Sequence, residues 1–507
     1  MRVLVTGGTG IVGQAAVAAL VRRGHAVRVL SRHARRDVTD ENTTLEARDG
    51  DVANALSIYG SADGCDAVVH AAGVVDESPP DRTYERVNVA GTRSIVREAM
   101  RAGVPKLVFV SSLGADRGGS AYHASKRAGE AICREFNGQW VVMRPGPVYG
   151  PGDHHVSVLL QMVRTLPAVP TIGDGKLRFQ PVWHEDLGLA LALAVERDDL
   201  ASRTLDLGGR ELTCQNELVH QMSALVGRDP PQLRLSNQLA SFGIRALGAV
   251  GIGVPFNQSQ LQMLVEGNRI DDGGTNALIG VFAVEPLPLA EGLQRLLDTQ
   301  PEQLSADGIG TLKRKRLWAD IHGSRLDADE LFQYLRDHLP ELMPAIVRMD
   351  AERRGVGTIE PGATLTLSLP MRGHAQVRVA EVQERRITLL TVAGHPLAGA
   401  VRFLVTGRGH ALRVEVHVYE RPATVVDYVA MRTAGEWLQR ATWTAFIRNL
   451  ARASGGKASE VERWDEDLSR DQALRVEEWL GSLSRRLQQS IAGRHKALHI
   501  VGTDGAD

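Results

Sequence analysis

The fold is decided by residues 2–25, which read RVLVTGGTGIVGQAAVAALVRRGH. A short apolar run breaks into a glycine-rich turn, and a helix-length segment follows. Glycine in such a turn permits a tight bend, close approach of the backbone to a pyrophosphate, and close packing of helix on strand. Gly7, Gly10 and Gly13 have this spacing, and the helix would direct the positive end of its dipole at the phosphates. The stretch therefore predicts dinucleotide binding.

The same alternation continues through the first half of the chain. Apolar runs at AVRVLS, DAVVHAAG, KLVFVSS and WVVMRPG are separated by helix-length segments such as NVAGTRSIVREAMRAG. Short apolar strands that alternate with helices indicate βαβ units and a parallel sheet buried on both faces. We therefore predict an α/β fold with a Rossmann-type, doubly wound parallel sheet, in which ligands bind beyond the carboxyl ends of the strands.

Composition fits an ordinary globular protein, with 507 residues, 43% of them hydrophobic and 23% charged. That length predicts about two to four domains. A net charge of −1 gives no bulk attraction to nucleic acid or an anionic membrane. Three dispersed cysteines, Cys65, Cys133 and Cys214, argue against a disulfide framework or a zinc site. We expect a cytoplasmic protein without a signal peptide or integral membrane span, and we read residues 239–256 as a buried helix and loop, with a membrane-surface segment as the alternative.

The end of the second predicted strand bears on the choice of cofactor. NAD-preferring sites usually carry an acidic residue there, whereas this chain has Ser31 and Arg32. Arg32, with Arg35 or Arg36, could meet a 2′-phosphate, so NADP(H) is favoured over NAD(H). The alternative is that these arginines belong to a solvated loop.

Residues 120–130, SAYHASKRAGE, place Tyr122 four residues before Lys126, on one face of a helix. A free tyrosine has a pKa of about 10, and a nearby ammonium favours its ionised form. The pair could therefore act in acid–base chemistry, or could be two polar residues on an ordinary helix. His184 and Glu185 in WHEDL are adjacent and have no further ligands at fitting spacing, so no metal site is predicted and a helix entry is expected there.

The ordered motifs TGGTGIVG, GDV, HAAG, VNVAGT, VFVSS, YHASK and RPGPVYGPGD resemble the short-chain dehydrogenase/reductase superfamily, in its extended and atypical branches. The resemblance covers about residues 1–300. It implies a cofactor site formed by Gly7, Thr9, Gly10, Ile11, Gly13, Ser31, Arg32, Asp51, Val52, Ala71, Ala72, Gly73, Asn88, Lys126, Pro145, Gly146 and Val148. Asp51 could instead be a turn residue, and Asn88 a capping or sheet-end residue.

The resemblance also implies a catalytic set of Ser112, Tyr122 and Lys126, with Ser111 as the fallback for Ser112. Hydride transfer would be assisted by the tyrosine as acid or base. The expected function is an NAD(P)-dependent oxidoreductase acting on a hydrophobic or sugar-like alcohol or ketone. The short spacing between Ser112 and Tyr122 is similar to the atypical branch near the 39-kDa subunit of respiratory complex I, some members of which keep a dinucleotide without known turnover. An epimerase or dehydratase, or a dinucleotide-bound scaffold or assembly factor, therefore remains an alternative.

The pattern changes after a predicted linker at residues 301–310. Alternating runs such as TLTLSL, QVRVAEV and LRVEVHVYE indicate antiparallel strands, and a long helical run follows. This order resembles the helix-grip (START-like) superfamily over about residues 311–455, which implies an α+β domain that could hold an apolar ligand. The alternative is a packed domain without a cavity. Residues 456–507 are expected to form a helical tail with a disordered end. The predicted partner is a small-molecule substrate, with no nucleic acid, and the oligomeric state stays open.

Overall fold

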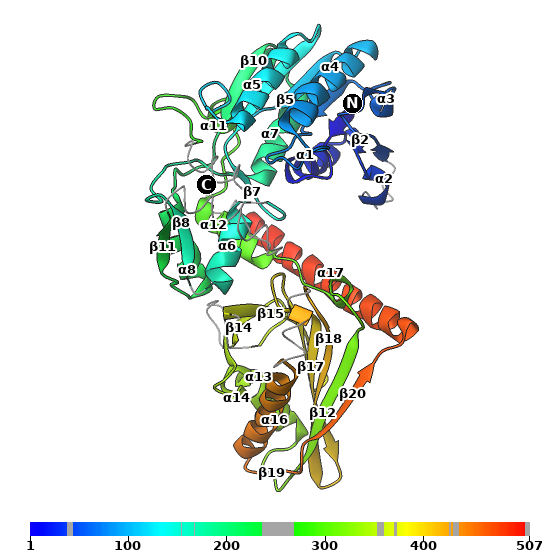
Figure 1. Ribbon diagram of the computed structural model, residues 1–507, viewed down its shortest axis with the longest axis vertical. Helices are drawn as coiled ribbons and strands as arrows, with labels where there is room; N and C mark the ends of the chain where they lie inside the picture. Colours follow the sequence, from blue (N-terminus) through cyan, green and yellow to red (C-terminus); the bar gives the residue numbers. More distant parts are fainter. Residues whose placement is uncertain are drawn as a thin grey trace. The chain divides into compact units, whose positions relative to one another are not determined.

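The computed structural model describes residues 1–37, 44–153, 155–166, 168–235, 268–351, 359–369, 373–424, 427–428 and 435–501 (Figure 1). Residues 239–256, for which a helix and loop were expected, lie outside this set, as does the end of the chain. The chain forms two compact units. The first comprises Met1–Leu159, Pro170–Gln221 and Gln232–Gln294, and the second comprises Leu160–Val169, Met222–Pro231 and Arg295–Asp507.

The first unit contains a seven-stranded parallel sheet, which confirms the Rossmann-type prediction. In spatial order its strands are β10 (Arg203–Leu207), β6 (Gln139–Pro145), β5 (Lys106–Val110), β4 (Ala67–His70), β1 (Arg2–Thr6), β2 (Ala26–Ser31) and β3 (Leu45–Asp49). The strand order reverses at β1, which lies between β2 and β4. Such a reversal leaves a crevice beyond the carboxyl ends of the strands.

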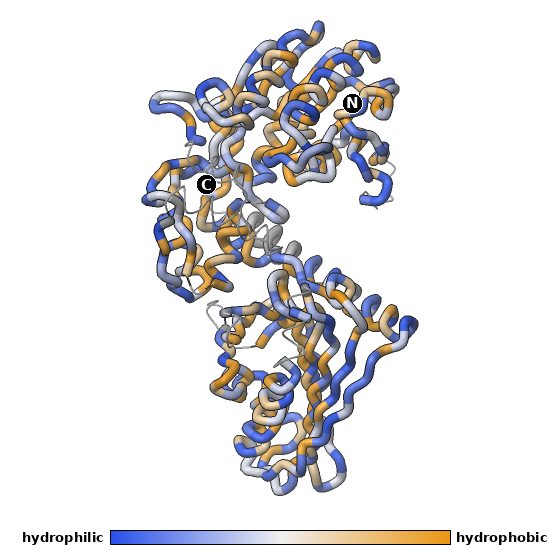
Figure 2. The backbone as a smooth tube through the Cα atoms, viewed as in Figure 1, coloured by the Kyte–Doolittle hydropathy of each residue, from blue (hydrophilic) through white to orange (hydrophobic). Residues whose placement is uncertain are grey.

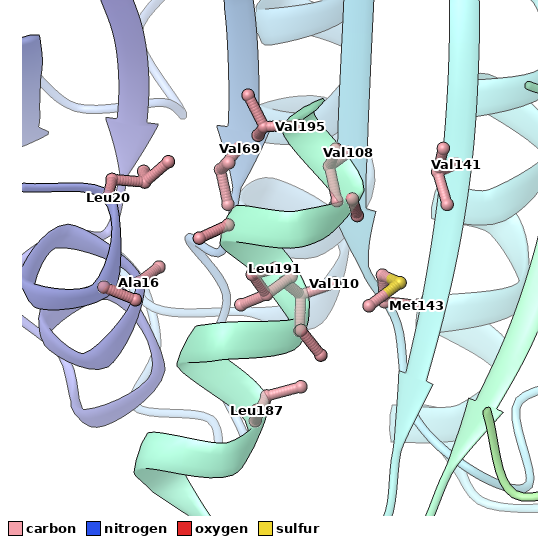
Figure 3. Packing of buried hydrophobic residues seen from close by; sticks show 14 of the residues in the cluster. Ala16, Leu20, Val69, Val108, Val110, Val141, Met143, Leu187, Leu191 and Val195 are labelled. Carbon is pink, nitrogen blue, oxygen red and sulfur yellow. The ribbon is translucent and has the colours of Figure 1, made fainter. Parts of the chain in front are cut away.

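Helices cover both faces of this sheet. Helices α1 (Ile11–Arg22) and α7 (His184–Glu196) pack on one face, where Figure 3 shows Leu20 and Leu191 among the valines of the strands. Helices α4 (Gly91–Arg101) and α5 (Ala121–Arg134) pack on the other. Consecutive residues of β1 are fully buried because successive side chains point to opposite faces and both faces are covered. This explains why the strands appear in the sequence as continuous apolar runs.

Shorter elements complete this part of the chain. They are α2 (Ala34–Asp37), α3 (Ala55–Ile58), the π-helix η1 (Tyr84–Ala90), β7 (Val148–Tyr149), α6 (Val156–Thr165), β8 (Val169–Ile172), β9 (Val182–Trp183), the 3-10 helix η2 (Asp198–Leu200), α8 (Gln215–Val226), β11 (Gln232–Leu235), α11 (Ala277–Gly280) and α12 (Leu289–Asp298). Strand β7 pairs with β9, and β8 with β11.

The second unit is built on a nine-stranded antiparallel sheet, as the alternating runs predicted. Its strands, in spatial order, are β13 (Arg348–Ala351), β14 (Thr364–Leu369), β15 (Gly373–Gln383), β16 (Arg386–Thr391), β17 (Leu397–Arg408), β18 (Ala411–Pro422) and β12 (Lys313–His322), and β19 (Lys457–Ala458) and β20 (Glu462–Asp467) both pair with β12. Fully buried residues alternate with partly buried ones along much of β12 and β18. Figure 2 shows hydrophobic and hydrophilic segments mixed along the strands of this sheet.

Helices α13 (Ala328–Asp337), α14 (Leu339–Leu342) and α16 (Glu436–Ala453) pack through apolar side chains on one face of this sheet. Helix α17 (Arg470–Val501) places Leu480 and Leu483 against Leu390 and Ala400. The predicted linker contains a 3-10 helix, η3 (Ser305–Asp307), and bridges to the sheet through Glu302 and Val392. Among the described residues, no helix is long and apolar enough to cross a membrane.

Candidate active site

A cleft of about 610 Å³ opens at the carboxyl ends of β1, β4, β5 and β6. Its lining includes most of the residues that the sequence predicted for cofactor and chemistry. These are Gly7, Thr9, Gly10, Ile11, Gly13, Ala71, Gly73, Ser112, Tyr122, Lys126, Pro145, Gly146 and Val148. The strand order brings them together from four separate segments of the chain.

The glycine turn forms the wall of the cleft beside α1. Gly7 has φ +68°, and its carbonyl oxygen accepts a hydrogen bond from the Gly10 N–H at 3.0 Å. A Cβ on Gly13 would lie 2.1 Å from that same oxygen, so the helix can approach the turn this closely only because residue 13 is glycine. The unbonded N–H groups at the start of α1 are suited to an anion such as a pyrophosphate.

Tyr122 and Lys126 lie on the first turns of α5, whose start is capped by the Ser120 hydroxyl accepting from the His123 N–H at 3.2 Å. Both side chains are buried, and Tyr122 makes a side-chain hydrogen bond with Ser112. The Lys126 ammonium donates to the Val110 carbonyl oxygen at 3.0 Å and lies 6.0 Å from the Tyr122 ring centroid. The cap and the strand end thus fix two hydroxyls and one ammonium at the cleft floor.

Burial dominates the acid–base properties of this trio. It raises the pKa of Tyr122 to about 12, although the hydrogen bond with Ser112 acts in the opposite direction. Burial lowers the pKa of Lys126 to about 8, while the carboxylate of Glu130 acts to raise it. The phenol is therefore protonated at neutral pH, and the amine mostly carries its charge.

The two serines at the end of β5 have different partners. Ser111 donates to the buried carboxylate of Glu130 at 2.6 Å, whereas the Ser112 hydroxyl donates to the Leu113 carbonyl oxygen at 3.3 Å and is close enough to Tyr122 to lower the pKa of its phenol. Between the two serines that the sequence left open, the geometry therefore favours Ser112 as the hydroxyl that meets a substrate together with Tyr122.

Other predicted cofactor residues lie beside the cleft. Ser31 ends β2, and Arg32 follows it with an exposed side chain. Asp51 accepts a hydrogen bond from the Ala53 N–H at 2.9 Å, as expected for a residue that stabilises a turn. Val52 is buried against Gly91 of α4.

Two further predicted residues support the cleft wall. Ala72 packs under the glycine turn, where its backbone would be 2.7 Å from a Cβ on Gly7. The Asn88 amide is buried and bonds both backbone groups of Val74 and the Ser125 hydroxyl. Asn88 therefore ties the segment after β4 to α5.

The cleft also contains residues that the sequence reasoning did not nominate. They are, among others, Asp76, Arg82, Asp153, His155, Phe179 and Asn268. Asp153 ends the RPGPVYGPGD motif and His155 lies two residues beyond it, so closeness to that motif could have indicated both residues. Phe179 comes shortly before the WHEDL segment, Asn268 is far from any quoted motif, and the fold brings both to the cleft.

Residues 3–208 match the sequence model of the NAD dependent epimerase/dehydratase family. This region is an NAD-dependent epimerase/dehydratase domain. A ceramide reductase of Caulobacter vibrioides is 29% identical over 249 residues, which cover 49% of this chain and 76% of that protein. A 2-alkyl-3-oxoalkanoate reductase of Stenotrophomonas maltophilia is 27% identical over 253 residues, 45% of this chain and 76% of that protein.

Both relatives of the epimerase/dehydratase domain are reductases, and the chain is an enzyme, as predicted. A nicotinamide dinucleotide is its class of cofactor. Among solved structures, a UDP-glucose 4-epimerase of Thermotoga maritima with UDP-glucose is 21% identical, with a TM-score of 0.46 over 59% of this chain and 98% of that chain.

Proposed function

We propose that this enzyme reduces a ketone to an alcohol on an apolar, alkyl-bearing substrate, with NADP(H) preferred over NAD(H). The observation that carries the proposal is the meeting of the Ser112 and Tyr122 hydroxyls with the Lys126 ammonium in the cleft that contains the glycine turn. Hydrogen-bond donors that converge on one oxygen suit a carbonyl that gains negative charge during reduction.

The chain's own residues supply the proton and hold the charge. A bound nicotinamide dinucleotide supplies hydride. Tyr122 donates its phenolic proton to the substrate oxygen, since its raised pKa keeps that proton in place at neutral pH. Ser112 polarises the same oxygen, and the ammonium of Lys126 stabilises the phenolate that remains.

An apolar substrate is supported by the cleft wall and by the relatives. Val74, Val75, Pro147, Pro151 and Phe179 line the cleft beyond the catalytic trio. The two relatives are a reductase of ceramide and a reductase of 2-alkyl-3-oxoalkanoates, and both kinds of molecule bear alkyl chains. Preference for NADP(H) is supported by the exposed Arg32 and the missing acid at the end of β2.

For the second unit we propose a helix-grip fold with an apolar ligand. The strand order β13 to β18 followed by β12, with α16 across the sheet, supports this fold. A cavity of about 70 Å³ lies between the sheet and α16, with Leu367, Leu389 and Trp443 in its lining, so the group held there would be small. Mass spectrometry of small apolar molecules extracted from the purified protein tests the idea, and extracts without any stoichiometric apolar molecule would count against it.

The reaction itself is tested by Tyr122→Phe, with NADPH oxidation followed on 3-oxoalkanoates of increasing chain length. We expect a loss of kcat of about 10²- to 10⁴-fold, with unchanged dinucleotide affinity. Tyr84→Phe is the matched control, because the Tyr84 hydroxyl bonds the Val75 carbonyl and its ring contacts Tyr122 edge-on. Near-normal turnover by Tyr122→Phe would refute the mechanism, and turnover without net NADPH consumption would favour an epimerase.

A further inference from the structure

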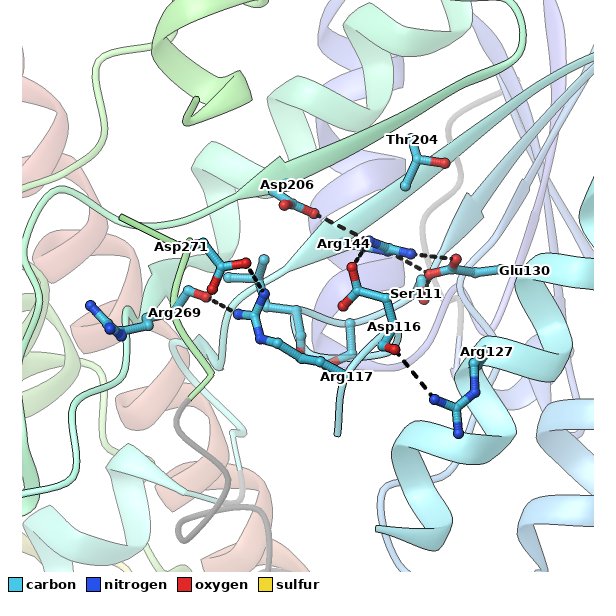
Figure 4. A network of polar contacts seen from close by, with 12 residues as sticks. Ser111, Asp116, Arg117, Arg127, Glu130, Arg144, Thr204, Asp206, Arg269 and Asp271 are labelled. Carbon is cyan, nitrogen blue, oxygen red and sulfur yellow. Dashed lines mark hydrogen bonds and ion pairs between the residues drawn. The ribbon is translucent and has the colours of Figure 1, made fainter. Parts of the chain in front are cut away.

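A buried carboxylate lies directly behind the catalytic trio. Glu130 is one helical turn after Lys126 on α5, and its side chain is 1% exposed. Arg144 of β6 binds it with two hydrogen bonds of 2.7 and 2.8 Å (Figure 4). Arg134 of α5 adds one of 2.9 Å. The fourth contact is the 2.6 Å bond from Ser111. Glu130 therefore joins α5 to the ends of both β5 and β6.

We propose that Glu130, held by Arg144, is a positioning residue that withdraws Ser111 from the substrate, leaves Ser112 to meet Tyr122, and keeps the ammonium of Lys126 charged. This inference rests on the proposed function of the same site. Glu130 is not itself expected to touch the substrate or the cofactor, because its carboxylate is already occupied by two arginines and a serine.

The selection between the two serines follows from their hydrogen bonds. Both residues follow β5 and border the cleft, so the partner of each hydroxyl is what separates them. The short bond to Glu130 fixes which of them points away from Tyr122. A hydroxyl bonded to a carboxylate is a stronger and more directional contact than one between neutral groups. The orientation of the strand end is thereby fixed before a substrate arrives.

The charge on Lys126 has only a few determinants among the described residues. Tyr122 and Glu130 share its helix, and His70 of β4 faces it from the sheet. His70 is neutral because burial, followed by the charge of Lys126, lowers its pKa to about 3. Glu130 is therefore the negative charge that opposes the effect of burial on Lys126.

Arg144 keeps Glu130 ionised, and it lies at the end of β6 beside the cleft lining. Burial alone would raise the pKa of Glu130, but the hydrogen bonds from Arg144, Ser111 and Arg134 outweigh it and lower that pKa. Arg144 also donates to Asp116 at 2.7 Å, and Pro145 and Gly146 follow it in the cleft lining. The same ion pair thus fixes the strand end that supplies one wall of the cleft.

The test compares Glu130→Gln with Arg134→Gln as the matched control. The control removes a half-exposed partner of Glu130 but leaves the carboxylate and both Arg144 bonds in place. We measure kcat and KM against pH with a 3-oxoalkanoate and NADPH. In parallel, we follow acetylation of Lys126 by acetic anhydride against pH, using mass spectrometry on the full chain without substrate.

For Glu130→Gln we expect kcat to fall roughly 10- to 100-fold at unchanged KM, as for a small misplacement of catalytic groups. The midpoint of Lys126 acetylation should move down by about one pH unit, the low end of the effect of an opposite charge nearby. Arg134→Gln, which keeps both Arg144 bonds to Glu130, should change kcat and the acetylation midpoint far less than Glu130→Gln does. Normal turnover and an unmoved midpoint in Glu130→Gln would overturn the proposal.

Two additions keep the outcomes separable. Glu130→Asp keeps the charge but shortens the side chain, so kcat should fall while the acetylation midpoint stays the same. A change in both kcat and midpoint, or in neither, contradicts the assignment. This variant gives the test even where Glu130→Gln does not fold. The acetylation readout needs no turnover. A midpoint shift in Glu130→Gln, with a wild type that reduces no carbonyl, would therefore refute the proposed reaction and leave the electrostatic role of Glu130 standing.

Discussion

Gly13→Ala is the most direct perturbation of the cofactor site. The new methyl group would lie 2.1 Å from the Gly7 carbonyl oxygen, 2.6 Å from the Gly8 Cα and 2.7 Å from the Gly7 carbonyl carbon. All three are backbone atoms, so no side chain can rotate away to make room. The glycine turn must move away from α1, and the turn is the surface that would receive the pyrophosphate.

The size of the effect is set by two opposing terms. Forcing a methyl group into a packed site costs about 1–3 kcal/mol. Replacing glycine by alanine inside a helix returns up to about 1 kcal/mol. An approach of 2.1 Å lies far below ordinary contact, so the upper part of the range applies and we expect a net loss of about 1–2 kcal/mol. When this free energy is lost from dinucleotide binding, the affinity falls about 5- to 30-fold.

The assay is isothermal titration with NADPH and NADH, combined with thermal unfolding of the same samples. Gly119→Ala is the neutral control, since a Cβ there meets nothing within 4 Å. Gly10→Ala separates fold from binding, because its Cβ would make only an ordinary 3.5 Å contact within the protein. We expect Gly10→Ala to lose affinity at unchanged melting temperature. Wild-type affinity and stability in Gly13→Ala would refute this account of the turn.

The other predictions address the cofactor, the second unit and pH. Arg32→Ala should weaken the binding of NADPH about tenfold and leave the affinity for NADH unchanged in the same titrations. Equal losses of affinity for both dinucleotides would show that Arg32 does not select NADPH. Glu302 forms a 2.7 Å ion pair with the fully buried Arg378. Glu302→Ala leaves that buried charge without its ion-pair partner and should lower the free energy of unfolding by about 3–5 kcal/mol, and Glu302→Gln should lower it by less. Burial lowers the pKa of His70 to about 3, so stability should fall as pH drops below the unfolded value of about 6.5, and His70→Gln should show a flatter melting temperature between pH 6.5 and 5.

The parts of the fold that the sequence predicted are those set by local chemistry. The glycine turn, the apolar strands and the helical spacing of Tyr122 and Lys126 each depend on a few consecutive residues. A parallel sheet covered on both faces leaves continuous apolar runs, which are easily recognised. The order of the strands then follows from short right-handed connections.

Other parts depend on partners far apart in the sequence. Strand β20, ERWDED, was expected to be part of a helical tail because it lacks apolar alternation. It is a strand because β12 supplies complementary charge, with Lys313 opposite Asp467 and Arg314 opposite Glu466. Opposite charges across a strand pair stabilise it. No local pattern in residues 462–467 contains that information.

Glu130 is a similar case within the site. From the sequence KRAGE alone, Glu130 would be expected on the exposed face of a helix. The pairing of β5 with β6 is what brings Ser111 and Arg144 to it. Asp51 is the reverse case, where the local turn accounts for the residue and its hydrogen bond to Ala53.

The protonation states of the trio also give the reaction a preferred direction. Reduction needs a proton at the substrate oxygen, and Tyr122, with its pKa raised to about 12 by burial, carries that proton throughout the neutral range. Oxidation of the alcohol needs the phenolate, whose formation burial opposes. Reduction should therefore hold level at neutral pH and decline above about pH 8, where Lys126 loses its charge. Oxidation should instead rise with pH, because each step upward increases the phenolate fraction. Initial rates in both directions from pH 6 to pH 10 test this, and parallel profiles for the two directions would show that Tyr122 is not the group that transfers the proton.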